Sequence, residues 1–263
     1  MYNPVVKFLK NFTTGYNTLM RLHRFIGDFN LSKPSSTKAL AGDNEIISKD
    51  KELVNQLLKV LRLKTGEKVI LCDGNANEAE AEIVLIRPTE VTFKIVKKYK
   101  NENEHDVHSK LYLSILKKEN FELAVQKAVE IGVSEIIPIL TERTIKTGLN
   151  INRLKKIIRE ASEQSGRGIM PNVSEPETFD NAIKEAKKNN DLNLFFDLGG
   201  KPLIDVKHQS LKIGIFIGPE GGWGEKERVI AEKEGFEICS FGKLVYRAET
   251  AAITAVYYVV NLL

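Results

Sequence analysis

A glycine-rich segment and a polar helix start are the residues of this chain best suited to build a ligand site. The first is residues 217–223 (IGPEGGW), which follow an apolar run, 213–217, that is typical of a buried strand. Glycines permit a sharp turn and let a ligand approach the main chain closely. The second segment, residues 247–252 (RAETAA), begins 24 residues after Trp223 and opens a long apolar helix. Two such segments at strand ends predict a ligand crevice in an α/β protein.

The glycine spacing argues against the common nucleotide-binding loops. The sequence GPEGG does not contain GxGxxG, and no GK[ST] follows it, so dinucleotide and P-loop sites are disfavoured. The same glycines are also compatible with a plain tight turn between a strand and a helix. The proline and glutamate inside the turn, together with RAETAA downstream, favour the ligand-binding interpretation.

A basic helix, expected over residues 151–165, leads into a second polar cluster at 159–167 (REASEQSGR). The simpler interpretation is a solvated basic face closed by a glycine. Arg167, just past the helix, could instead contact a phosphate or a base, because its guanidinium presents a fixed fork of donors. A third cluster runs over residues 117–144 and includes KK, QKAVEIGV and PxxTERT. On its own it would be a structural helix and strand.

The three clusters, in this order, resemble the SPOUT RNA methyltransferases, and among them the family that methylates N3 of a uridine in 16S ribosomal RNA. The resemblance implies an α/β SPOUT domain with a parallel sheet and a deep trefoil knot, a feature that is otherwise almost excluded from folds. It implies that the knot holds S-adenosylmethionine (SAM) in a bent shape, and that the protein is a homodimer. The apolar helix 251–263 would form the dimer interface or pack in the core.

By this resemblance, the cofactor is held by three strand-end loops, mainly through their backbone groups. The implied contacts are Phe196, Leu198, Ile217, Gly218, Glu220, Gly221, Gly222, Phe241, Gly242, Val245, Tyr246 and Ala251. Two positions depart from the family pattern. The family commonly has an arginine near the position of Leu244 and a leucine where Tyr246 lies.

The implied chemistry is methylation of a nitrogen that carries a proton. A general base should remove the N3 proton, and a cation should stabilise the charge that spreads onto the uracil carbonyls. Arg247 and Glu249, at the start of the final helix, are the candidates for these catalytic roles, and Arg167, from the same or a second subunit, is a further candidate. The implied RNA contacts are Arg24, Lys117, Lys127, Arg143, Gln164 and Arg167.

The elements that must position these residues fall into two parts. Residues 20–98 contain short strands at 68–74, 79–86 and 91–96 and one helix at 50–61, a pattern that predicts a small barrel. Residues 57–66 resemble the PUA-like RNA-binding domain of the same family. We expect residues 1–19 to be an extension and the charged residues 99–110 to be a linker.

Residues 111–263 alternate between strand and helix. Strands are expected at 111–116, 135–140, 193–198, 213–217 and 237–241, and helices at 121–132, 151–165, 225–234 and 250–262. This alternation predicts a mainly parallel sheet that is covered on both faces.

The composition is that of a soluble globular enzyme, with 263 residues, 42% of them hydrophobic and 28% charged. Residues 21–100 carry a net charge of +4, which favours a polyanionic partner such as 16S ribosomal RNA in the 30S subunit. The histidines and the two cysteines, Cys72 and Cys239, form no metal or disulfide pattern. With no apolar leader or membrane span, we expect a cytoplasmic protein without a metal, acting in ribosome biogenesis.

Two other functions remain open at the level of the sequence. A SPOUT enzyme that methylates the ribose 2′-hydroxyl would use the same cofactor loop on another target atom. A non-catalytic ribosome-assembly factor would bind RNA without binding SAM. The sequence EQSGR and the PUA-like front argue against the ribose methyltransferase, and the sequences GPEGG and RAET argue against the assembly factor.

Overall fold

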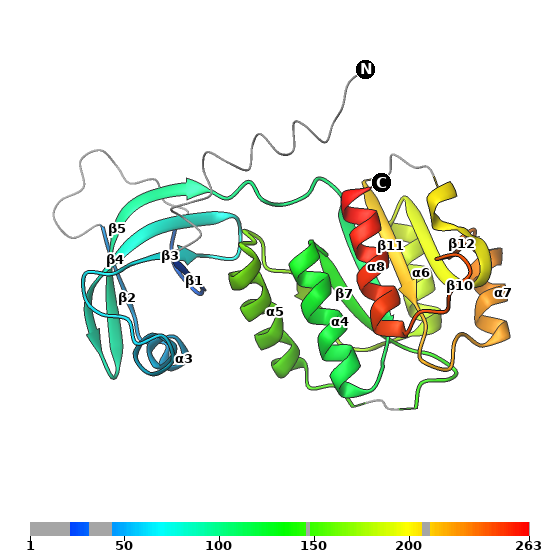
Figure 1. The fold of residues 1–263 in the computed structure, drawn as a ribbon, viewed down its shortest axis with the longest axis horizontal. Helices are drawn as coiled ribbons and strands as arrows, with labels where there is room; N and C mark the ends of the chain where they lie inside the picture. The colour runs from blue at the N-terminus through cyan, green and yellow to red at the C-terminus, as the bar shows by residue number, and fades with distance from the viewer. Residues whose placement is uncertain (1–21, 32–43, 146–147, 207–210, 263) are drawn as a thin grey trace, which may run out of the picture. The chain divides into compact units, whose positions relative to one another are not determined.

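The computed structural model describes residues 22–31, 44–145, 148–206 and 211–262. They form two compact units that divide between Glu102 and Asn103 (Figure 1). The expected extension at residues 1–19 lies outside the described residues. Regular structure extends to Lys100 on one side of the expected linker and resumes at His108 on the other.

The described residues of the first unit form a five-stranded sheet with one α-helix. In sheet order its strands are β1 (His23–Ile26), β3 (Lys68–Cys72), β4 (Asn77–Arg87), β5 (Glu90–Lys100) and β2 (Glu45–Ser48). The expected hairpin is present as the antiparallel pair β3 and β4, whereas β1 pairs with β3 in parallel. Apolar side chains from one face of this sheet, including Leu71 and Phe93, form the core of the unit.

The helix of the first unit begins as expected but ends differently. Asp50 caps α3 (Lys51–Asn55), because its side chain accepts hydrogen bonds from the N–H groups of Glu52 and Leu53. The expected α-helix then widens into a π-helical turn, Gln56–Val60, closed by a hydrogen bond from Leu61 N to Gln56 O. The turn carries the fully buried Leu57 into the core.

In the second unit, the residues that the structure describes form an all-parallel sheet and five α-helices. The sheet order is β12 (Glu237–Ser240), β10 (Leu192–Pro202), β11 (Lys212–Ile217), β6 (His108–Ser114), β7 (Glu135–Leu140) and β8 (Asn172–Val173), and β9 (Glu177–Thr178) also pairs with β7. The helices are α4 (Lys118–Ile131), α5 (Ile151–Ser165), α6 (Phe179–Asn189), α7 (Glu225–Lys233) and α8 (Ala248–Asn261). A short 3₁₀ turn, Leu203–Asp205, follows β10.

Helices cover both faces of this sheet because alternate strand residues point in opposite directions. Leu111 and Leu113 of β6 join a core with α4, α5 and α8, in which α4 packs between the other two helices (Figure 1). Tyr112, which lies between Leu111 and Leu113 in β6, points to the opposite face of the sheet. There it stacks on Phe216 in the core beneath α6 and α7. Helix α6 was not expected from the sequence. Within the described part of the chain, none of the helices combines the length and the apolar character that a membrane span needs.

The chain crosses itself closely where β10 meets β12. β10 pairs with β12 in two stretches, and its register shifts between Phe196 and Lys201. At the shift, Gly200 lies against the backbone of Cys239, so that a Cβ atom at Gly200 would lie 2.7 Å from the Cys239 carbonyl carbon. Only glycine fits such an approach of two backbones. The crossing keeps the carboxyl ends of β10, β11 and β12 together, and the pocket lies there.

Candidate active site

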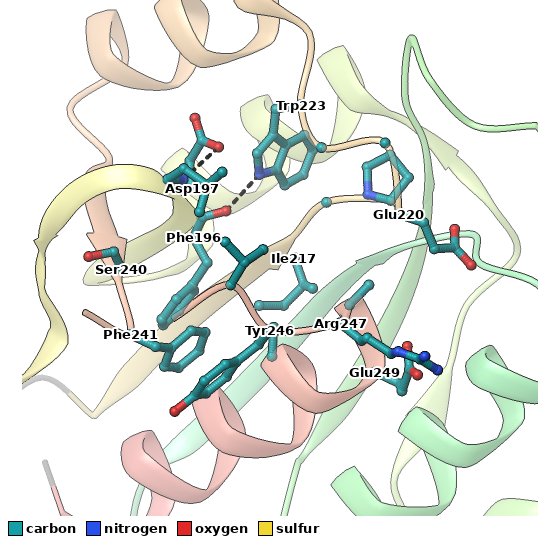
Figure 2. Close-up of a pocket in the computed structure, with 18 of the residues that line it drawn as sticks. Phe196, Asp197, Ile217, Glu220, Trp223, Ser240, Phe241, Tyr246, Arg247 and Glu249 are labelled. Atoms are coloured by element: carbon teal, nitrogen blue, oxygen red, sulfur yellow. Dashed lines mark hydrogen bonds between the residues drawn. The ribbon is translucent and has the colours of Figure 1, made fainter. Parts of the chain in front are cut away.

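A cavity of about 660 Å³ opens at the carboxyl ends of β10 and β11 (Figure 2). Its walls come from the two segments that the sequence singles out, together with the end of β10 and the start of α4. The lining comprises Lys117, Asn120, residues 196–198, residues 217–223, residues 239–242, residues 244–249 and Ala251. A volume of this size is typical of a site for a small molecule or cofactor.

The glycine loop, defined here as residues 217–224, is held in place by directional contacts. A tight turn places Gly222 in the left-handed region (φ 71°), where its N–H donates to Pro219 O. The buried Trp223 donates its Nε1–H to Phe196 O over 2.8 Å. At the tip, a carboxylate oxygen of Glu220 accepts a hydrogen bond from Lys117 N, just before α4.

The opposite part of the lining, the aromatic loop (residues 241–247), is held by ring contacts. Phe241 stacks on Phe196 of β10 with ring centroids 4.7 Å apart, and Tyr246 stacks on Phe241 at 4.9 Å. The three rings form one column on a side of the cavity (Figure 2). Leu244 and Val245, which lie between Phe241 and Tyr246 in the sequence, are 73% and 74% exposed.

Arg247 and Glu249 lie at the first turn of α8, on the other side of the cavity from Phe241 and Tyr246 (Figure 2). Glu249 is only 8% exposed, and its Oε2 atom is buried with no hydrogen-bond partner in the described structure. The amino end of the helix favours a carboxylate at this position. An unpaired buried carboxylate oxygen is costly, so this atom is suited to accept a proton or a hydrogen bond from a ligand.

Two other titratable groups of the pocket lining, Asp197 and Cys239, are not suited to act as a base or a nucleophile. Asp197 pairs with Arg228 of α7 over 2.9 Å and accepts a hydrogen bond from Leu198 N. Burial raises the pKa of the Cys239 thiol to about 12, so the group is a neutral thiol at physiological pH and not a nucleophile. These assignments leave Glu249 as the carboxylate best suited to proton transfer in the lining.

The structure brings together all twelve residues expected to contact the cofactor, and each of them lines the cavity. The expected catalytic residues Arg247 and Glu249 and the expected RNA contact Lys117 also line it. Asn120 and Ser240 also line the cavity and were not expected from the sequence. Asn120, one turn along α4 from Lys117, could have been found by the helical period.

Arg167 lies outside the pocket lining and is 7% exposed. Its guanidinium pairs with Glu104 over 2.6 Å and donates to the carbonyls of Val129 and Val133 at the end of α4. Burial opposes ionisation of Glu104, but hydrogen bonds from Arg167 and from Ile169 N outweigh it and hold the pKa of the carboxyl below its usual value. In this chain the guanidinium is therefore committed to joining the ends of α4 and α5.

The other expected RNA contacts are spread over the chain. Arg24 forms an ion pair with the buried Glu78 in the first unit. Lys127 pairs with Glu130 over 2.9 Å along α4, and Gln164 is exposed on α5. Arg143 donates to Gly221 O over 2.8 Å, behind the glycine loop. No cluster of His, Cys, Asp and Glu able to hold a metal occurs among the described residues.

Comparisons with known proteins agree with this geometry. Residues 103–260 match an RNA methyltransferase domain, and residues 50–96 match an RNA methyltransferase PUA domain. The chain is 34% identical to the ribosomal RNA small subunit methyltransferase E of Mesomycoplasma hyopneumoniae, over 74% of this chain and 86% of that one. It is also 34% identical to ribosomal RNA small subunit methyltransferase E 2 of Borreliella burgdorferi, over 83% and 92%.

Solved structures show the same fold. The ribosomal RNA small subunit methyltransferase E of Neisseria gonorrhoeae, bound to SAM, superposes with a TM-score of 0.77 at 28% identity, covering 89% of this chain and 95% of that one. The putative methyltransferase Lpg2936 of Legionella pneumophila, also bound to SAM, gives 0.80 at 28% identity, over 91% and 97%. The expected fold, a SPOUT domain preceded by a PUA-like domain, is confirmed.

Proposed function

The chain belongs to the ribosomal RNA small subunit methyltransferase E family, and on this premise we propose that it transfers the methyl group of SAM to N3 of a uridine in 16S ribosomal RNA. The single observation that carries the proposed chemistry is the buried, unpartnered Oε2 of Glu249 in the pocket lining. An acceptor oxygen kept from water beside the reacting atoms is what removal of the N3 proton requires.

The pocket fits SAM in size and in chemistry. Its volume of about 660 Å³ suits a nucleoside joined to an amino acid. The rings of Phe196, Phe241 and Tyr246 offer apolar surface for an adenine. Gly218, Gly221 and Gly222 let the ligand approach the main chain. When bound, SAM supplies an electrophilic methyl group.

The residues of α8 prepare the acceptor. Glu249 takes the N3 proton, and Arg247 stabilises the negative charge that moves onto the uracil carbonyls. Arg247 is the N-cap residue of α8 and Glu249 lies in its first turn, so both are placed at this end of the pocket. The walls of the pocket hold the base and the methyl donor in line, which supplies much of the rate enhancement.

The RNA contacts include one residue of this pocket. Lys117, in the lining, contacts the phosphate of the target nucleotide. Arg24 of the first unit and Lys127, Arg143 and Gln164 of the second contact other parts of the RNA. The uridine must be single-stranded or flipped out of its stack to reach Glu249. Basic contacts to phosphates make binding fall steeply with salt. Arg167 is retained as a further candidate for contact with the RNA or the target base, in the same or a second subunit; within one chain its guanidinium bonds to Glu104 and to the carbonyls of Val129 and Val133.

We also propose that the protein is a cytoplasmic homodimer. One side of α8 is buried against the sheet, while Tyr257 and Leu262 are 51% and 61% exposed. Together with Leu244 and Val245 of the aromatic loop, they leave apolar surface that a second copy would cover. Sedimentation velocity on the full chain tests the dimer.

A methyl-transfer assay tests the function. Radiolabelled SAM is incubated with 30S subunits or free 16S RNA that lack the modification, and the nucleosides are identified by mass spectrometry. 3-Methyluridine is the expected product, and its loss in Glu249→Ala but not in Thr250→Ala, an exposed neighbour on α8, assigns the base. A 2′-O-methylated nucleoside would identify the ribose methyltransferase instead. Absence of SAM binding would favour the assembly factor.

A further inference from the structure

A buried carboxylate that does not line the pocket joins two segments behind the glycine loop. Glu227 of α7 is 6% exposed and lies outside the pocket lining. One of its oxygens accepts a hydrogen bond from Gly224 N, at the end of the glycine loop, and the other from Glu142 N, each over 2.8 Å. Both oxygens are therefore satisfied by backbone groups from separate parts of the chain.

The segment that Glu227 holds is itself a tight turn. Thr144 N donates to Thr141 O over 3.1 Å, and Thr141 N donates to Thr144 Oγ1 over 2.9 Å. These bonds close the turn around Glu142 and Arg143. Because Glu142 N is tied to Glu227, the position of the whole turn depends on that carboxylate.

From this turn, Arg143 reaches the tip of the glycine loop. Its guanidinium donates to Gly221 O over 2.8 Å. The position that a Cβ of Gly221 would take is 3.7 Å from the arginine's Cβ and Cδ, so the stem of Arg143 also packs there. Glu227 thus acts on the loop at two points, directly at Gly224, its last residue, and through Arg143 at Gly221, at its tip.

We infer that Glu227 is a positioning residue for methyl transfer, which fixes the glycine loop in its ligand-binding shape before the ligand arrives. The inference rests on the proposed function, because the ligand it concerns is SAM. Ligands bind more tightly to a site that is already formed, since less order is lost on binding. Glu227 touches neither the pocket nor the reacting atoms, so its effect passes through the loop.

Glu227→Gln tests this role with little change in size. The amide offers one acceptor oxygen and one donor, so one of the two backbone N–H groups loses its acceptor. The matched control is Glu225→Gln, which removes an exposed charge from the same helix. A second control, Ile158→Val on the buried face of α5, lowers stability without touching the glycine loop. Arg143→Met is exposed and keeps the stem, so it serves as a second variant if Glu227→Gln fails to fold.

Trp223 provides a readout that does not depend on SAM, because it is the only tryptophan of the chain and lies in the glycine loop. We expect Glu227→Gln to shift its emission to longer wavelength and to raise the calorimetric Kd for SAM about tenfold, as loss of a charged hydrogen bond predicts. The KM for RNA stays within about twofold. Arg143→Met shifts emission and Kd in the same direction by a smaller factor, roughly threefold.

The inference would be overturned if Glu227→Gln left both the Trp223 emission and the Kd for SAM unchanged. If only Arg143→Met folds, the same result in that variant would overturn it. Changes of equal size in either control variant would also overturn it. If the wild-type protein fails to bind SAM, the proposed function is wrong, and the emission of Trp223 still decides whether Glu227 positions the loop.

Discussion

The glycine loop and the aromatic loop line the same pocket but are held by different forces. The glycine loop is fixed by hydrogen bonds at Gly221, Trp223 and Gly224. The aromatic loop is held by two ring stacks, Phe196 on Phe241 and Phe241 on Tyr246. Its residues Leu244 and Val245 are largely exposed. Hydrogen bonds demand one geometry, whereas stacked rings tolerate sliding. We expect the first wall to set where the ligand lies and the second to adjust to it.

The largest expected effect lies between the walls, at Glu249. Glu249→Gln keeps the size of the side chain and removes its capacity as a base, so turnover should fall by about 10²–10⁴. The Kd for SAM should change little, because the role concerns the acceptor. Single-turnover methyl transfer measures the loss. A decrease of less than about tenfold would remove Glu249 from the mechanism.

A methyl group added to the hydrogen-bonded wall should have the next largest effect. A Cβ atom at Gly218 would lie 3.0 Å from the ring of Trp223, which is held by its bond to Phe196. Gly218→Ala should therefore weaken SAM binding by about tenfold or more, since overpacking costs about 1–3 kcal/mol. Gly148→Ala, at a site with open space, is the matched control. Equal affinities would mean that this wall also adjusts.

Removing the hydrogen bond between Trp223 and Phe196 without adding bulk should destabilise the fold moderately. Trp223→Phe keeps an aromatic ring between Phe179 and Phe195 but leaves Phe196 O without its donor. Loss of the hydrogen bond and of part of the ring should lower the free energy of unfolding by about 1–3 kcal/mol. Urea denaturation followed by circular dichroism measures this difference. An unchanged urea midpoint of unfolding would show that this hydrogen bond adds nothing to stability.

The smallest effect is expected in the aromatic loop. Tyr246→Leu removes the outer ring of the column and leaves an apolar side chain in its place. Because an aromatic pair contributes about 0.5–1.5 kcal/mol, the Kd for SAM should rise only about two- to tenfold. Isothermal titration calorimetry measures the change. An effect larger than that of Gly218→Ala would reverse the proposed order of the two walls.

The pocket segments could be predicted because each is contiguous in the sequence. The glycine loop and the start of α8 carry their chemistry within a few residues, and all twelve expected cofactor contacts line one cavity. Five of the seven strands in the described parallel sheet were likewise predictable from short apolar runs, whereas the two-residue strands β8 and β9 were not expected. β10 continues to Pro202, beyond its apolar part, because its second stretch pairs with β12.

The remaining features depend on partners that are distant in the sequence. Arg167 is held by Glu104, 63 residues away, and no local pattern distinguishes this pair from a free arginine past a helix. The same is true of Glu227, whose second partner is 85 residues away at Glu142. Helix α6 has a clear apolar stripe, with Phe179, Ala182, Ile183 and Ala186 buried, so it was predictable and was overlooked.

The close crossing of Gly200 and Cys239 has a consequence for how the protein matures. The pocket draws its lining from both sides of this crossing, so a chain in which the crossing has not formed cannot present a complete site. Contacts between such distant segments carry a loop-closure cost that slows folding. The ability to bind a ligand therefore arises only once the crossing has formed, and a ligand that recognises the finished pocket also selects fully folded molecules from a mixed population.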